Sequence, residues 1–170
     1  MKKILILGSG GSGKSTFAMK LAKKLDLPLY HLDALYWKPN RVKPSDEEWK
    51  QTVKSIVQKE SWIVDGSYFG TLQLRVLEAD TIIFLDIPNY QCIWNIVKRR
   101  LKYAKWTGKI RPGLASHTSE KIYFSFLKWV WNYPKKEKPK VFSTIEKYKL
   151  PNSSIFHFKN YKSLYSFFLT

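Results

Sequence analysis

The sequence is short of cysteine and of long apolar runs, and each shortage excludes a class of protein. Its lone cysteine, Cys92, cannot form a disulfide within the chain, and no cluster of Cys and His has zinc-ligand spacing. A disulfide-stabilised secreted fold and a zinc module are therefore excluded, and we expect a reducing, cytoplasmic location. The apolar run after Lys2 and Lys3 ends at Leu7, too early for a signal peptide, and no run approaches the length of a membrane span.

Acidic residues and arginines are also scarce. The chain has 13 Asp and Glu against 30 Lys and Arg, which gives a net charge of +17. Such a charge attracts polyanions, including nucleotides, nucleic acids and acidic membrane surfaces. Only five of the cations are arginines, the better bidentate phosphate ligands, so either those five hold specific positions or a coding bias favours lysine. No helix-turn-helix or single-strand-binding signature is found, so any nucleic-acid binding is expected to be non-specific.

The most specific motif is the run Gly-Ser-Gly-Gly-Ser-Gly-Lys-Ser from Gly8 to Ser15. It matches the phosphate-binding loop pattern of Gly, four free positions, Gly, Lys and Ser or Thr. An apolar, strand-like run precedes it and helical spacing follows it, which is the required order. In such a loop the backbone N–H groups and a helix N-terminus bind a polyanion such as the triphosphate of ATP.

The motif assigns roles to individual residues. We expect Lys14 to contact the β- and γ-phosphates and act in catalysis, and the Ser15 hydroxyl to ligate Mg²⁺. The nucleotide-binding set predicted for the loop is Gly8, Ser9, Gly10, Gly11, Ser12, Gly13, Lys14, Ser15 and Thr16.

Strand-like and helical patterns alternate along the whole chain. Besides the run before the loop, residues 29–33, 61–66, 81–86 and 154–158 have the character of buried strands. Helices are predicted after Lys14, over 45–60 with a capping box, over 71–79, after Pro88, from 119, before Lys149 and from Tyr161. This alternation predicts a single α/β domain over 1–170, a five-stranded parallel sheet between two layers of helices.

Two stretches of the second half carry explicit expectations. The aromatic-rich helix from 119 is expected to be mostly buried, with a nucleobase-stacking surface as the alternative. The basic run from Pro134 to Lys140 is interpreted as a solvated turn. Between the helices, residues 107–118 contain Gly108, Arg111 and Pro112 but few large apolar residues, which is typical of a functional lid.

Carboxylates at the expected strand ends are candidates for metal binding and catalysis. Asp65 or Asp86 could hold magnesium, and Asp65 is favoured because Gly66 beside it suits a crowded site. Asp33 is expected at the end of the second strand, facing the ligand crevice. Arg75 is interpreted either as a clamp for an anionic group or as an ion-pair partner of Glu78 on its own helix.

With these motifs the chain resembles the adenylate-kinase-like P-loop kinases and, more closely, the bacterial family of DNA topology modulation proteins. The closer resemblance rests on four segments: His31–Pro39, Trp62–Tyr68, Thr81–Asp86 and Phe126–Asn132. The resemblance implies an acceptor-side segment at about 33–60 and a lid at about 103–118.

Position by position, the resemblance implies that Asp65 holds magnesium through water. It implies that Arg99 or Arg100 lies near the adenine or the phosphates, and that Arg111 reaches the transferring group. Adenylate kinases follow Asp-Gly with an aromatic residue, Pro and an Arg that clamps the acceptor phosphate, whereas Ser67, Tyr68 and Phe69 stand here. Asp33 instead resembles the Asp that accepts the acceptor's proton in P-loop kinases of hydroxylated small molecules.

The sequence therefore predicts a cytoplasmic, ATP- and Mg²⁺-dependent kinase whose acceptor is an unidentified small molecule or nucleotide. The alternative is an ATP-dependent, DNA-associated regulator of topology without small-molecule kinase activity. A nucleotide-binding fold without catalysis is a third, weaker alternative. The pattern makes no prediction about oligomeric state.

Overall fold

The computed structural model describes residues 1–37, 42–102 and 123–169 of the chain. Its strands form one five-stranded sheet in the order β2-β3-β1-β4-β5, and every neighbouring pair is parallel. This confirms the predicted α/β fold with a five-stranded parallel sheet. The strands are β1 (Lys3–Gly8), β2 (Leu29–His31), β3 (Trp62–Asp65), β4 (Thr81–Leu85) and β5 (Ser154–Phe158).

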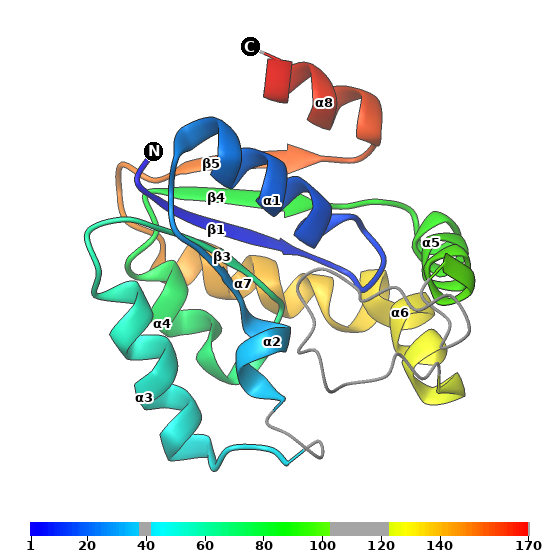
Figure 1. Cartoon of the computed structure of the whole chain (residues 1–170), viewed down its shortest axis with the longest axis horizontal. Coiled ribbons are helices and arrows are strands. Elements are labelled where there is room, and N and C mark those ends of the chain that lie inside the picture. The colour runs from blue at the N-terminus through cyan, green and yellow to red at the C-terminus, as the bar shows by residue number, and fades with distance from the viewer. Residues whose placement is uncertain (38–41, 103–122, 170) are drawn as a thin grey trace.

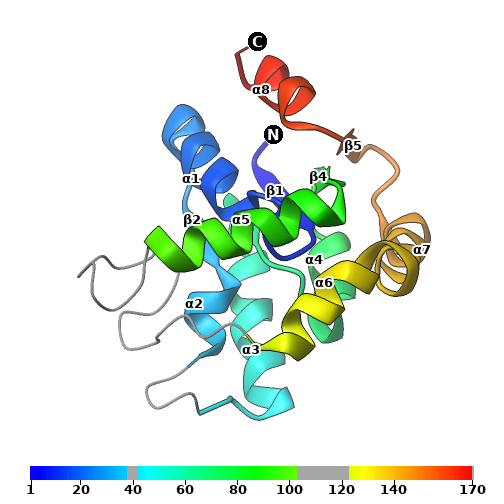
Figure 2. The same cartoon turned by 90° about the vertical axis from the view of Figure 1, so that its right-hand side faces the viewer.

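Helices cover both faces of this sheet (Figures 1 and 2). Residues of β1 alternate between two hydrophobic cores, because successive strand side chains point to opposite faces. Ile4 and Ile6 pack with the layer formed by α1 (Lys14–Leu25), α5 (Asn89–Lys102) and α8 (Tyr161–Leu169). Leu5 and Leu7 pack with the other layer, which contains α2 (Leu32–Tyr36), α3 (Asp46–Val57), the 3₁₀ helix η2 (Phe69–Thr71), α4 (Leu72–Val76) and α7 (Lys138–Tyr148).

The helix α6 (Phe124–Lys136) contributes one buried residue to each core, Val130 to the first and Tyr133 to the second. It therefore joins the two layers near the end of the sheet where β1 meets the phosphate-binding loop (Figure 1). Among the helices of the described ranges, none combines the length and apolarity that a membrane span requires.

Local sequence signals set the start of α3. The Ser45 hydroxyl accepts a hydrogen bond from the Glu48 backbone N–H at 3.2 Å, and the Glu48 carboxylate accepts one from the Ser45 N–H at 2.9 Å. These two bonds form the predicted capping box and satisfy two N–H groups that the helix leaves open.

The second strand is shorter than the sequence pattern predicts. It ends at His31, and α2 begins at Leu32, whose side chain is fully buried. Asp33 was expected at the end of a strand, but it lies in the first turn of a helix. A carboxylate is favourable there because the first turn carries the positive end of the helix dipole.

The predicted basic turn from Pro134 to Lys140 is wrong. The α6 helix continues through Pro134 to Lys136, and α7 begins at Lys138 with Pro139 in its first turn. A proline in the first turn loses no helical hydrogen bond, since N–H groups there have no partner within the helix. Burial of Tyr133 on one helix and Val141 on the next keeps both helices against the core.

Most aromatic side chains of α6 are not buried, which corrects the expectation of a buried helix. The side chains of Phe124 and Trp131 are 82% and 55% exposed, and of this helix only Val130 and Tyr133 are buried. The aromatic stripe therefore cannot be explained by core packing alone.

A buried arginine holds the chain that follows β3. The Arg75 guanidinium is fully buried and donates hydrogen bonds to the carbonyls of Gly66 at 2.7 Å, of Thr71 at 3.2 Å, and of Tyr68. Both predicted roles of Arg75 are wrong, because it faces backbone oxygens and Glu78 pairs instead with Lys3 at 2.8 Å. Burial lowers the pKa of Arg75 to about 9, so the group stays charged at neutral pH.

Replacing Arg75 should therefore loosen this segment. We expect Arg75→Met to lower the free energy of unfolding by about 3 kcal/mol, because three buried carbonyls lose a charged donor. Urea denaturation measures the change. Lys50→Met, at an exposed position on α3, is the matched control and should stay within about 0.5 kcal/mol of the wild type. Equal stability of the two variants would contradict the role assigned to Arg75.

Candidate nucleotide site

The phosphate-binding loop connects the end of β1 at Gly8 to the start of α1 at Lys14. The loop packs closely against α5: a Cβ atom on Gly11, whose φ is +78°, would lie 2.2 Å from the carbonyl oxygen of Cys92. The first turn of α1 contains no acidic residue, and within the described chain no side chain caps it. The N–H groups and the dipole of this helix start are therefore available to an anion.

Buried polar groups of the loop are also suited to a phosphate. The Lys14 ammonium donates a hydrogen bond of 2.8 Å to the carbonyl of Ser9, across the loop. Burial lowers the pKa of Lys14, although the nearby carboxylates of Asp65 and Asp33 favour its charged form. The hydroxyls of Ser9 and Ser12 are buried and have no hydrogen-bond partner among the described residues. Of these groups, only the Lys14 ammonium belongs to a residue that lines the cavity beside the loop.

Asp65 lies at the end of β3, buried beside the loop. Its carboxylate lies 2.9 Å from Nδ1 of His31 and accepts a hydrogen bond from Ser15. Burial opposes ionisation of Asp65, but the bond to His31, the charge of Lys14 and the bond from Ser15 outweigh it and lower the pKa. Asp65 is therefore ionised, which is the form in which a carboxyl group binds magnesium.

His31 is a site residue that the sequence reasoning missed. The parallel register of β2 and β3 places His31 directly opposite Asp65. The available signal was that both residues lie near the carboxyl ends of the predicted strands 29–33 and 61–66, and the carboxyl ends of parallel strands meet at one edge of a sheet.

Asp86, the alternative metal ligand, does not line the cavity that surrounds the phosphate-binding loop. Its carboxylate accepts hydrogen bonds from Lys138 Nζ at 2.5 Å and lies 2.9 Å from Nε2 of His157. Burial works against its ionisation, but these two partners lower the pKa of Asp86. The carboxylate thus ties the chain after β4 to α7 and β5, which is a structural role.

Asp33 reaches the cavity from α2. The Tyr68 hydroxyl donates a hydrogen bond of 3.0 Å to the Asp33 carboxylate, and burial together with Asp33 raises the pKa of Tyr68. The two elements approach closely at Gly66: with a φ of +146°, its Cβ would lie 2.8 Å from the Leu32 side chain. Glycine at this point lets the chain after β3 pack on α2, so that Asp33 and Asp65 open into one cavity.

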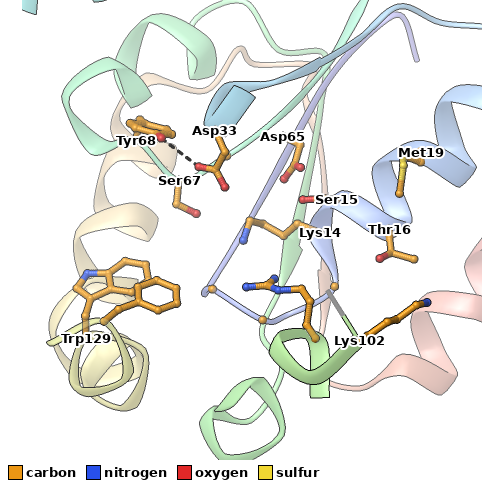
Figure 3. A pocket seen from close by; sticks show the side chains of 16 residues that line it. Lys14, Ser15, Thr16, Met19, Asp33, Asp65, Ser67, Tyr68, Lys102 and Trp129 are labelled. Carbon is orange, nitrogen blue, oxygen red and sulfur yellow. Dashed lines mark hydrogen bonds between the residues drawn. The ribbon is translucent and has the colours of Figure 1, made fainter. Parts of the chain in front are cut away.

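This cavity has a volume of about 520 Å³ and collects most of the predicted site residues (Figure 3). Gly8, Ser9, Ser12 and Arg100 do not line it, and Arg111 and the predicted lid at 103–118 lie outside the described residues. The predicted residues that line it are Gly10, Gly11, Gly13, Lys14, Ser15, Thr16, Asp33, Asp65 and Arg99. The lining residues that were not among the predicted site residues are Met19, Gly66, Ser67, Tyr68, Lys102, Phe126 and Trp129.

Phe126 and Trp129 form an aromatic wall of the cavity, on the helix for which a nucleobase-stacking surface was expected only as the alternative to burial. Their rings stack with centroids 5.8 Å apart and an interplanar angle of 15°. The three-residue spacing that places them on one face of α6 was the signal available in the sequence.

The donor set beside the loop fits a hydrated magnesium ion that shares its ligands with a nucleotide. The Ser15 hydroxyl and the Asp65 carboxylate are hard oxygen donors, the type that Mg²⁺ prefers. In the described ranges no group of three or more His, Cys, Asp or Glu side chains is placed to hold a metal. The remaining ligands of such an ion would be phosphate oxygens and water.

The comparisons with known proteins support the fold. No family model matches the chain, and none of the curated proteins matches its sequence. The structure is similar to deoxyadenosine kinase from M. mycoides with bound products dCMP and a flexible dCDP: 17% identity, 98% of this chain and 96% of that chain covered, TM-score 0.55. The same enzyme with bound dATP has 16% identity and a TM-score of 0.52, with 99% of this chain and 97% of that chain covered. With bound dCTP it has 16% identity and a TM-score of 0.50, with 98% of this chain and 96% of that chain covered. The chain thus shares its α/β fold with this kinase.

Proposed function

We propose that the protein transfers the γ-phosphoryl group of ATP to a small-molecule or nucleotide acceptor. The observation that carries this proposal is one cavity lined by the phosphate-binding loop and by two carboxylates, Asp65 and Asp33. A nucleotide switch needs the loop and a carboxylate near the metal. A second carboxylate that opens into the same cavity is what a kinase needs to orient an acceptor.

Each predicted residue then has a role that depends on its position. Lys14 would donate hydrogen bonds to the β- and γ-phosphates, and Arg99 would contact the nucleotide from α5. Ser15 and Asp65 would hold magnesium, which neutralises phosphate charge when bound. Catalysis would then consist of positioning and electrostatic stabilisation, with Asp33 orienting the acceptor.

The remaining parts of the proposal rest on resemblance. The kinase pattern implies Arg99 or Arg100 near the adenine or the phosphates, Arg111 on a lid at about 103–118 and an acceptor segment at about 33–60. The deoxyadenosine kinase of M. mycoides binds dATP and dCTP in a similar fold, which supports nucleotide binding here. Membership of the DNA topology modulation family is proposed from the four sequence segments that resemble it.

An ATP-consumption screen over nucleotides, nucleosides, sugars and other hydroxylated metabolites tests the proposal. We expect at least one class to stimulate ADP formation, and Lys14→Ala to lower that rate by about 10²- to 10³-fold, since it removes a charge from the transferring group. The protein is not a small-molecule kinase if no acceptor stimulates ADP formation, or if Lys14→Ala retains the wild-type rate.

Asp65 and Asp86 stand at the ends of β3 and β4, the two strands that flank β1, and allow a matched test of the metal site. We expect Asp65→Asn to require at least ~10-fold more Mg²⁺ for half-maximal turnover, because an amide carries no charge to attract the ion. Asp86→Asn should leave the Mg²⁺ requirement unchanged, although it removes the negative charge that faces Lys138 and His157. Magnesium titrations of turnover measure both. An equal shift in the two variants would contradict the assignment of Asp65.

The net charge of +17 favours the second candidate function, an ATP-dependent DNA-associated regulator. DNA affinity measured against salt concentration separates the two proposals. If the protein is a kinase that binds DNA only through its positive charge, we expect its DNA affinity to fall steeply with salt concentration. Neither ATP nor Lys14→Ala should change that dependence. DNA binding that requires ATP and is lost in Lys14→Ala would favour the regulator.

A further inference from the structure

The cavity has two chemically different ends, on either side of Lys14. Figure 3 places Thr16, Met19 and Lys102 on one side of the Lys14 and Ser15 side chains, and Asp33, Tyr68 and Trp129 on the other. Because the lysine of such a loop contacts the β- and γ-phosphates, the transferred group lies near its ammonium. The acceptor therefore approaches from the side of Asp33, Tyr68 and Trp129.

The charges are divided in the same way. Among the described residues the cations that line the cavity are Lys14, Arg99 and Lys102, from α1 and α5. The elements of the other side, α2, α6 and the chain after β3, contribute no lining cation within the described ranges. Arg75 lies behind that chain and donates to its carbonyls, so it is not available to a ligand. This end contains a carboxylate instead, which repels a phosphate.

The same end has a flat aromatic wall. Phe126 and Trp129 stack on each other at its edge, and Trp129 remains 36% exposed. The Tyr68 ring, which directs its hydroxyl to Asp33, is held by Tyr36 at 4.6 Å and Trp49 at 5.2 Å between ring centroids. A planar ring gains stacking energy against such side chains, whereas a simple polyol does not.

We propose that this end of the cavity binds an uncharged nucleoside, with its base on the Phe126 and Trp129 wall and a hydroxyl directed to Asp33. This inference rests on the proposed kinase function and specifies the acceptor: a hydroxyl, not a phosphate, receives the phosphoryl group. The hydroxyl oxygen bonds to the γ-phosphorus of ATP while the bond from that phosphorus to the β,γ-bridging oxygen breaks. ADP leaves with the electron pair, and the hydroxyl proton passes to the Asp33 carboxylate.

Binding measurements on the full-length protein test this assignment. The probes are the common nucleosides and deoxynucleosides, their 5′-monophosphates, and inositol as a ring polyol without a flat face. Each is titrated by calorimetry with and without Mg²⁺ and the non-hydrolysable β,γ-methylene analogue of ATP. We expect at least one nucleoside to bind at least ~10-fold more tightly than its monophosphate and than inositol, because Asp33 repels phosphate and the wall selects a flat ring.

Variants of α6 locate the bound base. Trp129→Ala should weaken nucleoside binding by about 10- to 100-fold, the usual loss of one stacking partner. Its affinity for the ATP analogue should stay unchanged. Trp131→Ala is the matched control, since Trp131 is on the same helix, is 55% exposed and does not line the cavity. Its backbone carbonyl, which accepts a hydrogen bond from Asn89, remains in the variant.

The outcomes distinguish this inference from the proposed function. If the ATP analogue binds and no nucleoside does, or if monophosphates bind more tightly, only the nucleoside assignment is overturned. Equal loss of ATP-analogue and nucleoside affinity in Trp129→Ala would instead place the donor base on the wall and also overturn it. If a nucleoside binds but the analogue does not, the kinase function fails while the nucleoside site stands. Asp33→Asn should lower nucleoside phosphorylation far more than nucleoside affinity, and equal losses would contradict its role.

Discussion

Two buried charges of opposite sign, the Lys14 ammonium and the Asp65 carboxylate, are the constraint on which the site depends. Burial disfavours the charged form of each group, and each stabilises the charge of the other. Their proximity follows from the sheet, because β1 and β3 are parallel neighbours with Ile6 opposite Asp65. A phosphate with magnesium would add charges of both signs between them, so this charge pair also suits a nucleotide.

The chain after β3 connects this charge pair to the rest of the cavity. The Ser67 hydroxyl donates a hydrogen bond of 2.7 Å to the carbonyl of Gly8, where the phosphate-binding loop begins. One residue further, Tyr68 holds Asp33, and Arg75 fixes the backbone of both Gly66 and Tyr68 from behind. A shift of this segment therefore moves Asp33 relative to the loop, although none of these contacts involves a ligand.

Local patterns predicted the fold and the loop because their causes are local. Apolar runs of strand length gave all five strands, and the Ser45 and Glu48 pair gave the start of α3. Residues whose roles depend on tertiary contacts were predicted less well. The pairing of His31 with Asp65 requires the register of two strands, and Arg75 finds its partners only after α4 packs against the chain following β3. Hydrophobic periodicity likewise cannot distinguish an aromatic side chain in a core from one that lines a cavity.

The two ends of the cavity are built from different parts of the chain, and this explains why the sequence predicted more of the proposed donor end than of the proposed acceptor end. The proposed donor end comes mainly from the loop and α1, a continuous segment whose spacing matches the phosphate-binding motif, and α5 adds Arg99 and Lys102. The proposed acceptor end combines α2, the chain after β3 and α6, with Trp49 of α3 supporting Tyr68 from behind. Since no short motif spans these elements, the positions of Tyr68 and Trp129 relative to Asp33 emerge only from the folded arrangement. A different side chain at Tyr68 or Trp129 would change this proposed acceptor end without altering the contacts within the phosphate-binding loop.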